Sequence, residues 1–201
     1  MKKLASGTVV LLGILGVALI LFFWGVSVRN NIVVQDEGVS TAWSNVQTQY
    51  QRRADLIPNL VNTVKGYAKH EQETFTQVVE ARTKATQVTV DPENLTPEKL
   101  QEFNAAQGEL SQALGRLIAI QESYPDLKAN EQFMELQAQL EGTENRINES
   151  RTKFNEAVQT YNQYIRQFPQ NIVASICSFA KKDKFEASAA AQDAPVVNFN
   201  E

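Results

Sequence analysis

The side chains best suited to acid–base chemistry in this sequence are His70 and the neighbouring carboxylates of Glu71 and Glu73. A histidine beside acidic residues can act as a general acid or base. On one turn of helix, however, both carboxylates point away from His70, and the position three residues before it carries Tyr67 rather than Glu or His. We therefore interpret His70 as a solvated histidine on a helix face, and we predict no catalytic residue.

Motifs for metals and cofactors are missing from the sequence. It contains no His-Glu-x-x-His, Cys-x-x-Cys or Gly-x-Gly-x-x-Gly run, and a single histidine cannot supply a pair of metal ligands. The single cysteine, Cys177, cannot close a disulfide within the chain. We expect no metal, no cofactor and no enzymatic activity.

A second polar group surrounds a proline inside a helical pattern. Proline lacks an amide proton and its ring crowds the carbonyl four residues earlier, so the sequence predicts a kink around 54–58. Nearby charged side chains or water can satisfy the carbonyls that a bend frees, and Asp55 can pair with Arg52. Either these residues form a local polar network at the kink, or they are a contact site for a partner chain; the candidates are Arg52, Arg53, Asp55, Pro58 and Asn59.

A long apolar segment precedes these side chains. Residues 4–28 carry no ionisable side chain, and as a helix they would be roughly 37 Å long, enough to cross a hydrocarbon core of about 30 Å. A cleaved signal peptide is the alternative, because Lys2 and Lys3 precede the run, but the run is longer than usual and lacks an Ala-x-Ala site. We predict a short flank at 1–3 and a retained transmembrane helix at 4–28.

Flanking charge predicts the orientation of that helix. Lys2 and Lys3 precede it, whereas only Arg29 follows closely. This asymmetry places the amino terminus in the cytoplasm and the rest of the chain outside. We expect a single-pass protein with Trp24 and Arg29 at the membrane interface.

The remainder of the chain is acidic. The whole chain has 19 Lys and Arg against 23 Asp and Glu, and setting aside the three bases up to Arg29 leaves 16 bases against those 23 acids. Such a surface is a poor partner for nucleic acid and for anionic lipid head groups. Membrane attachment is therefore expected from the apolar helix alone, and we exclude nucleic acid as a partner.

From Asp36 onward the apolar pattern becomes periodic, with spacings of four and three residues that are typical of helices packed along one another. Val39, Trp43, Val46, Tyr50 and Arg53 open this pattern. It predicts one long helix over 36–86, kinked near 58, in which Arg82 lies off the apolar stripe and is solvated.

Two further long helices and a short one follow. Thr96 and Pro97 begin a helix predicted at 97–124, and Asn130 begins one at 130–168. Short links predict that the three long helices run antiparallel in turn, the first and third leading away from the membrane. A short helix at 171–180 would fold back over Tyr164 and Phe168.

The fold class predicted is therefore all-α: one transmembrane helix continuing into an elongated antiparallel bundle of three to four helices over 29–186. Residues 187–201 are rich in Ala and Ser and are predicted to be a flexible tail, or else a segment that docks on a bundle.

Several motifs cover nearly the whole chain. The most specific is Arg-Arg-Ala-Asp-Leu-Ile-Pro-Asn-Leu-Val at 52–61, and others lie at 36–39, 42–46, 64–67, 70–71, 81–82, 161–162, 168–169, 185–186 and 195–199. With the single amino-terminal span, they resemble the LemA family of bacterial proteins. The resemblance implies a membrane-anchored helical bundle of the cell envelope without a known enzymatic activity, and one relative belongs to the set that builds magnetosome membranes.

Two functions remain open. The chain could be a self-associating scaffold in membrane organisation, or an adaptor or sensor that recruits another envelope protein. The expected partners are the lipid bilayer, further copies of the chain and, in the second case, an envelope protein. The expected location is the bacterial inner membrane.

Overall fold

The computed structural model describes residues 2–92 and 95–185 of the chain, and the predicted tail at 187–201 lies outside them. The described residues contain helices and no strand, which confirms the all-α fold class. In order the α-helices are α1 (Lys2–Tyr67), α2 (Gln72–Gln87), α3 (Pro97–Ala119), α4 (Pro125–Lys128), α5 (Glu131–Arg166) and α6 (Gln170–Ile176), with a 3-10 turn at Ile120–Glu122 before α4.

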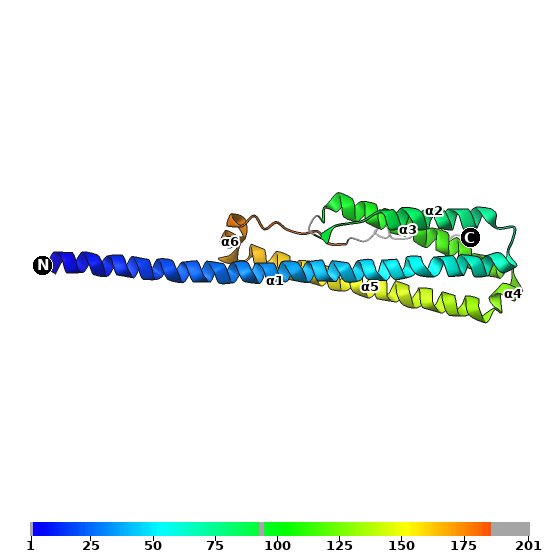
Figure 1. The fold of residues 1–201 in the computed structure, drawn as a ribbon, viewed down its shortest axis with the longest axis horizontal. Helices are drawn as coiled ribbons and strands as arrows, with labels where there is room; N and C mark the ends of the chain where they lie inside the picture. The colour runs from blue at the N-terminus through cyan, green and yellow to red at the C-terminus, as the bar shows by residue number, and fades with distance from the viewer. Residues whose placement is uncertain (1, 93–94, 186–201) are drawn as a thin grey trace, which may run out of the picture.

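The first helix is the axis of the molecule. In Figure 1 it runs the full length of the structure, with the other helices packed along its second half. Its side chains from Gly7 to Ser27 are almost all exposed, and burial begins at Val28 and Ile32. Within the described residues, α1 is the helix long and apolar enough to cross a membrane.

The prediction of one helix over 36–86 needs correction, because α1 ends at Tyr67 and α2 begins at Gln72. The amide of Ala68 still donates to the carbonyl of Val64 at 2.9 Å, and the chain then turns, with the amide of Glu71 donating to the carbonyl of Ala68 at 3.2 Å. Apolar spacing looks the same in a straight helix as in one folded back on the same core. Periodicity therefore could not detect this turn.

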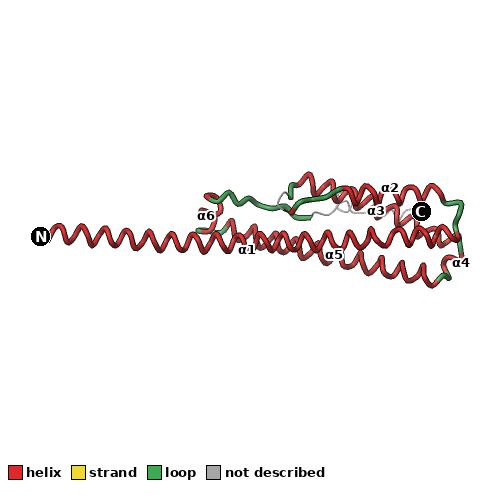
Figure 2. Tube along the Cα trace, in the orientation of Figure 1, coloured by secondary structure: helices red, strands yellow, loops and turns green. Residues whose placement is uncertain are grey.

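That turn also corrects the predicted course of the later helices. Figure 1 and Figure 2 show α2 returning along α1, α3 running outward again, and α5 returning toward the apolar segment. The last long helix therefore ends beside residues 28–32 of α1 rather than at the far end. Thr96 caps α3 by accepting from the amide of Lys99, and Asn130 caps α5 by accepting from the amide of Phe133 at 2.8 Å.

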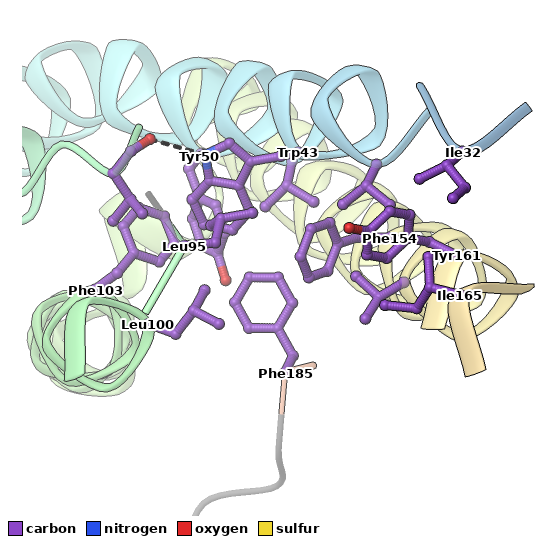
Figure 3. Packing of buried hydrophobic residues seen from close by; sticks show 14 of the residues in the cluster. Ile32, Trp43, Tyr50, Leu95, Leu100, Phe103, Phe154, Tyr161, Ile165 and Phe185 are labelled. Atoms are coloured by element: carbon purple, nitrogen blue, oxygen red, sulfur yellow. Dashed lines mark hydrogen bonds between the residues drawn. The ribbon is translucent and has the colours of Figure 1, made fainter. Parts of the chain in front are cut away.

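Two hydrophobic clusters hold the bundle together. The one nearer the apolar segment centres on Trp43, which is fully buried and whose ring lies 5.4 Å from the rings of Phe103 and Phe154 (Figure 3). Its indole nitrogen donates to the carbonyl of Val90 at 2.9 Å, which ties the loop after α2 to α1. The far cluster includes Phe75, Leu117, Leu127 and Phe133.

The short helix α6 folds back as expected but does not cover what we expected. Ala174 is buried and Val173 packs against the first cluster, whereas Phe168 is 80% exposed and Ile176 is 78% exposed. The expected cover over the Phe168 ring is therefore wrong, because Ala174 and Val173 face the core whereas Ile172 and Ile176 face out.

Candidate functional site

The most polar part of the core is built around Arg53, which is only 1% exposed. One terminal nitrogen of its guanidinium donates to the carboxylate of Glu144 on α5 at 2.7 Å and to the hydroxyl of Ser111 on α3 at 2.9 Å. The other donates to the side-chain oxygen of Gln107 at 2.6 Å. A planar guanidinium suits such multiple contacts, so this one side chain joins α1, α3 and α5.

The network extends to a fourth helix and to an aromatic ring. The amide nitrogen of Gln107 donates to the carbonyl of Ala85, the last buried residue of α2, at 3.1 Å. The Arg53 guanidinium also lies 5.1 Å from the centre of the Tyr50 ring. Burial raises the pKa of the Tyr50 hydroxyl, which stays protonated at neutral pH.

Pro58 lies within α1, which continues through it without a break. Because proline has no amide proton, the carbonyl of Ala54 receives no hydrogen bond from position 58. The Nε of Arg82 on α2 donates to that carbonyl at 2.8 Å instead. Arg82 is therefore not simply solvated, as we expected, but links α2 to the position that the proline leaves open.

The five candidate residues from the sequence thus separate into a buried one and four exposed ones. Arg52, Asp55, Pro58 and Asn59 are exposed, and only Arg53 points into the bundle. Asp55 does not pair with Arg52; it accepts from the amide nitrogen of Gln51 at 2.8 Å. The exposed members Arg52 and Asp55 lie on an open, nearly flat face of α1 together with Ser44, Gln47, Thr48 and Gln51.

Sequence reasoning missed a second arrangement, in which residues 180–185 are held along α5 by asparagine side chains. Asn162 accepts from the amide of Lys182 at 3.0 Å and donates to its carbonyl at 2.7 Å. Asn155, seven residues earlier, does the same with Phe185 at 2.9 and 3.1 Å. The seven-residue spacing places both asparagines on one face of the helix, which was the available signal.

Those contacts bring the Phe185 ring into the core. It stacks on the Trp43 ring at 5.6 Å and lies edge-on to Phe154 at 5.3 Å (Figure 3). The ammonium of Lys182 forms an ion pair with Asp36 at 2.7 Å. Residues 180–185 therefore contact both α1 and α5, and we call them the closing segment.

The remaining candidates offer little chemistry. His70 is exposed in the turn after α1, while Glu71 accepts a long 3.4 Å contact from the Tyr124 hydroxyl. Among the described residues no three His, Cys, Asp or Glu side chains lie together in a way that could hold a metal. A cavity beside Tyr50, Phe103 and Gln107 measures about 90 Å³, well below the volume of ordinary ligand pockets.

The two candidates for the membrane interface lie on α1 just before the bundle. Trp24 is partly exposed and Arg29 is exposed, and between them Val28 is already buried by the bundle. The apolar segment and the packed part of the molecule therefore meet within these few residues.

Comparison with known proteins places this architecture in a family. The model of the LemA family matches residues 42–199. Magnetosome protein MamQ 2 of Paramagnetospirillum magneticum is 28% identical over 84% of this chain and 68% of its own length. Magnetosome protein MamQ of Magnetospirillum gryphiswaldense is 26% identical over 98% of this chain and 79% of its own length. Protein LemA of Metamycoplasma hominis is 24% identical over 84% of this chain and 74% of its own length.

Proposed function

The chain belongs to the LemA family, and from that premise we propose that it is a single-pass scaffold of the bacterial inner membrane that organises the membrane by self-association. The observation that carries this proposal is the continuity of α1. One helix of 66 residues contains both the apolar segment and the side of the bundle along which α5 packs.

This continuity has a mechanical consequence. A bundle attached through a flexible linker could adopt any angle to the bilayer, whereas one built on the spanning helix itself is held upright. Neighbouring copies in one membrane would then stand parallel and present the same faces at the same height. Repeated lateral contact is the geometry that a scaffold requires, and the relatives named as magnetosome proteins support a role in membrane organisation.

The same architecture supports a role without catalysis. Both terminal nitrogens of Arg53 are engaged in contacts between helices, and the cavity beside them is too small for an ordinary substrate. We propose that Arg53 stabilises the bundle rather than reacting.

Self-association is tested on the full-length chain in native membranes. Amine-reactive crosslinking before solubilisation, followed by mass photometry in mild detergent, should give species of two or more copies. Only monomers in both measurements, at the concentration found in cells, would contradict the scaffold. Crosslinking after dilution into excess empty vesicles serves as the control for random collisions.

Orientation has its own test, because Cys177 is the only cysteine and is exposed. We propose a cytoplasmic amino terminus with the bundle outside. In the Cys177→Ser background, a membrane-impermeant maleimide should label Ser123→Cys, an exposed position at the far end of the bundle, in intact spheroplasts, and Cys177→Ser alone should remain unlabelled. Labelling only after permeabilisation would reverse the proposed topology.

The second candidate is an adaptor that recruits another envelope protein. The exposed face of α1 that carries Arg52 and Asp55 favours it, since exposed charges on an open surface suit a transient partner. Substituting both residues with Ala should then remove a stoichiometric partner from a pull-down and leave the oligomer unchanged. A scaffold that used this face would lose its own oligomer instead.

A further inference from the structure

The most exposed large hydrophobic side chains in the described part of the molecule are not in the apolar segment. They are Phe168 and Ile176, at 80% and 78%, and Ile172 between them is 49% exposed. The spacing of four residues places Ile172 and Ile176 on one face of α6. A soluble surface rarely gathers large apolar side chains in so short a stretch without a partner.

The position of α6 indicates what that partner is. In Figure 1, α6 lies at the end of the bundle nearest the apolar segment, against α1. Burial of α1 begins there, at Val28, which is also the last residue of the predicted transmembrane helix. If α1 spans a bilayer over 4–28, then α6 lies at the level where hydrocarbon gives way to head groups.

Charge at this end of the molecule differs from the rest. The chain has a net charge of −4, yet no Asp or Glu occurs in residues 1–35 or in 157–182. Of the six bases in these stretches, Lys2 and Lys3 precede the apolar segment and Lys182 pairs with Asp36. The other three, Arg29, Arg166 and Lys181, are exposed. The overall acidity that argued against lipid contact therefore conceals a basic, apolar end, the combination that binds anionic membrane surfaces.

We infer that Phe168, Ile172 and Ile176 insert into the outer leaflet of the bilayer that α1 crosses, so that α6 is a second, interfacial membrane contact. This inference rests on the proposed membrane anchoring. Two contacts at one level, α1 and α6, resist tilting of the bundle in a way that a single helix cannot. The head groups at this level would be anionic phospholipids, matched by the three exposed bases.

Cys177 provides a direct probe, because it follows Ile176 and is exposed. The full-length protein, carrying a nitroxide spin label at Cys177, is reconstituted into vesicles of phosphatidylcholine and phosphatidylglycerol. The label should be more accessible to oxygen, which partitions into lipid, than to a water-soluble nickel complex. As a control, the label is moved to position 123, at the far end of the bundle beside α4, in the double variant Cys177→Ser with Ser123→Cys. There it should be more accessible to the nickel complex than to oxygen.

A pair of matched variants tests whether the apolar side chains cause this protection. The double variant Ile172→Asp with Ile176→Asp should make the Cys177 label more accessible to the nickel complex and less accessible to oxygen. Val79→Asp with Met134→Asp changes two exposed apolar side chains, 50% and 49%, outside this end of the molecule and should leave the accessibility of the label unchanged. Circular dichroism verifies that both variants keep the helical fold.

Trp24 separates failure of this inference from failure of the anchor. Quenching of its fluorescence by brominated lipids reports insertion of α1, while the other tryptophan, Trp43, is buried in the bundle. If Trp24 is quenched but the labels at Cys177 and Ser123→Cys are equally exposed to water, the anchor stands and the interfacial role of α6 is overturned. Absence of Trp24 quenching would reject the anchor, and with it this inference.

Discussion

At the scale of single residues, the two adjacent arginines before Pro58 differ in exposure and therefore in role. Arg52 is exposed, whereas Arg53 contacts three other helices directly or through Gln107. The periodic pattern placed Arg53 on the apolar stripe, so its inward direction could be predicted from the sequence. Its partners could not, because Ser111 and Glu144 lie 58 and 91 residues away.

We predict that Arg53→Met lowers the free energy of unfolding by about 2 kcal/mol, because Gln107 and the partly exposed Glu144 lose a charged partner. Thermal unfolding of the full chain in detergent, followed by circular dichroism, measures the loss. Arg52→Met is the matched control, and its effect should stay within about 0.5 kcal/mol. Equal effects of the two substitutions would show that the buried network contributes little.

Tyr161 predicts a dependence of stability on alkaline pH. Burial, together with the charge of Asp36, raises the pKa of its hydroxyl to about 12 from its ordinary value of 10.0. The folded state therefore holds this proton more firmly than the unfolded state, and its contribution to stability is complete below pH 10 and is lost as the pH rises toward 12. The hydroxyl also donates to the carbonyl of Ala180 at 3.0 Å.

The variant Tyr161→Phe should accordingly be less stable than the wild type near pH 8 by about 1 kcal/mol, the worth of a typical hydrogen bond. The difference should shrink above pH 10. Urea unfolding of both proteins at several pH values measures it. A constant difference up to pH 12 would mean that Tyr161 does not titrate in this range.

At the scale of elements, α1 continues through a proline because another helix compensates for it. The carbonyl of Ala54 would be left without a donor, and Arg82 of α2 supplies one. The sequence predicted a kink near residue 58 and no turn near residue 68, whereas the chain actually turns after Tyr67. A proline is therefore compatible with an unbroken helix when a neighbour satisfies the freed carbonyl.

This compensation predicts non-additive substitutions. Arg82→Met alone should lower the free energy of unfolding by about 1–2 kcal/mol, since the Ala54 carbonyl loses its charged donor. In a Pro58→Ala background the amide gained at position 58 can donate to the same carbonyl, so Arg82→Met should cost less. A double-mutant cycle by thermal unfolding measures the difference. The same cost in both backgrounds would show that Arg82 acts through other contacts.

At the scale of the whole molecule, α1 determines how far the bundle extends from the apolar segment. Residues 29–67 of α1 correspond to about 58 Å of helix at about 1.5 Å per residue. The closing segment and α6 both lie toward the end of the bundle near the apolar segment, so the last described residues of the chain hold that end together. Its far end is held by the cluster around Phe75, Leu117 and Phe133.

We predict that the bundle rises about 58 Å above the bilayer surface, because the same helix spans the membrane and forms the core. Atomic force microscopy of full-length protein in supported bilayers measures this height. The variant Asn31→Pro, which interrupts α1 where it leaves the apolar segment, should lower and broaden the height distribution. A wild-type height near the width of the bundle would mean that the rod lies flat on the membrane.

The sequence by itself determined the all-α class, the apolar segment, the starts of α3 and α5 at Thr96 and Asn130, and the inward direction of Arg53. These follow from local chemistry: hydrophobic periodicity, capping side chains and proline geometry. Only the tertiary structure decided the turn after Tyr67, the return of α5 to the apolar segment, the partners of Arg53 and Arg82, and the closing segment. Each of these depends on contacts between residues far apart in the chain, and an apolar stripe with one period fits a straight helix and a folded one equally well.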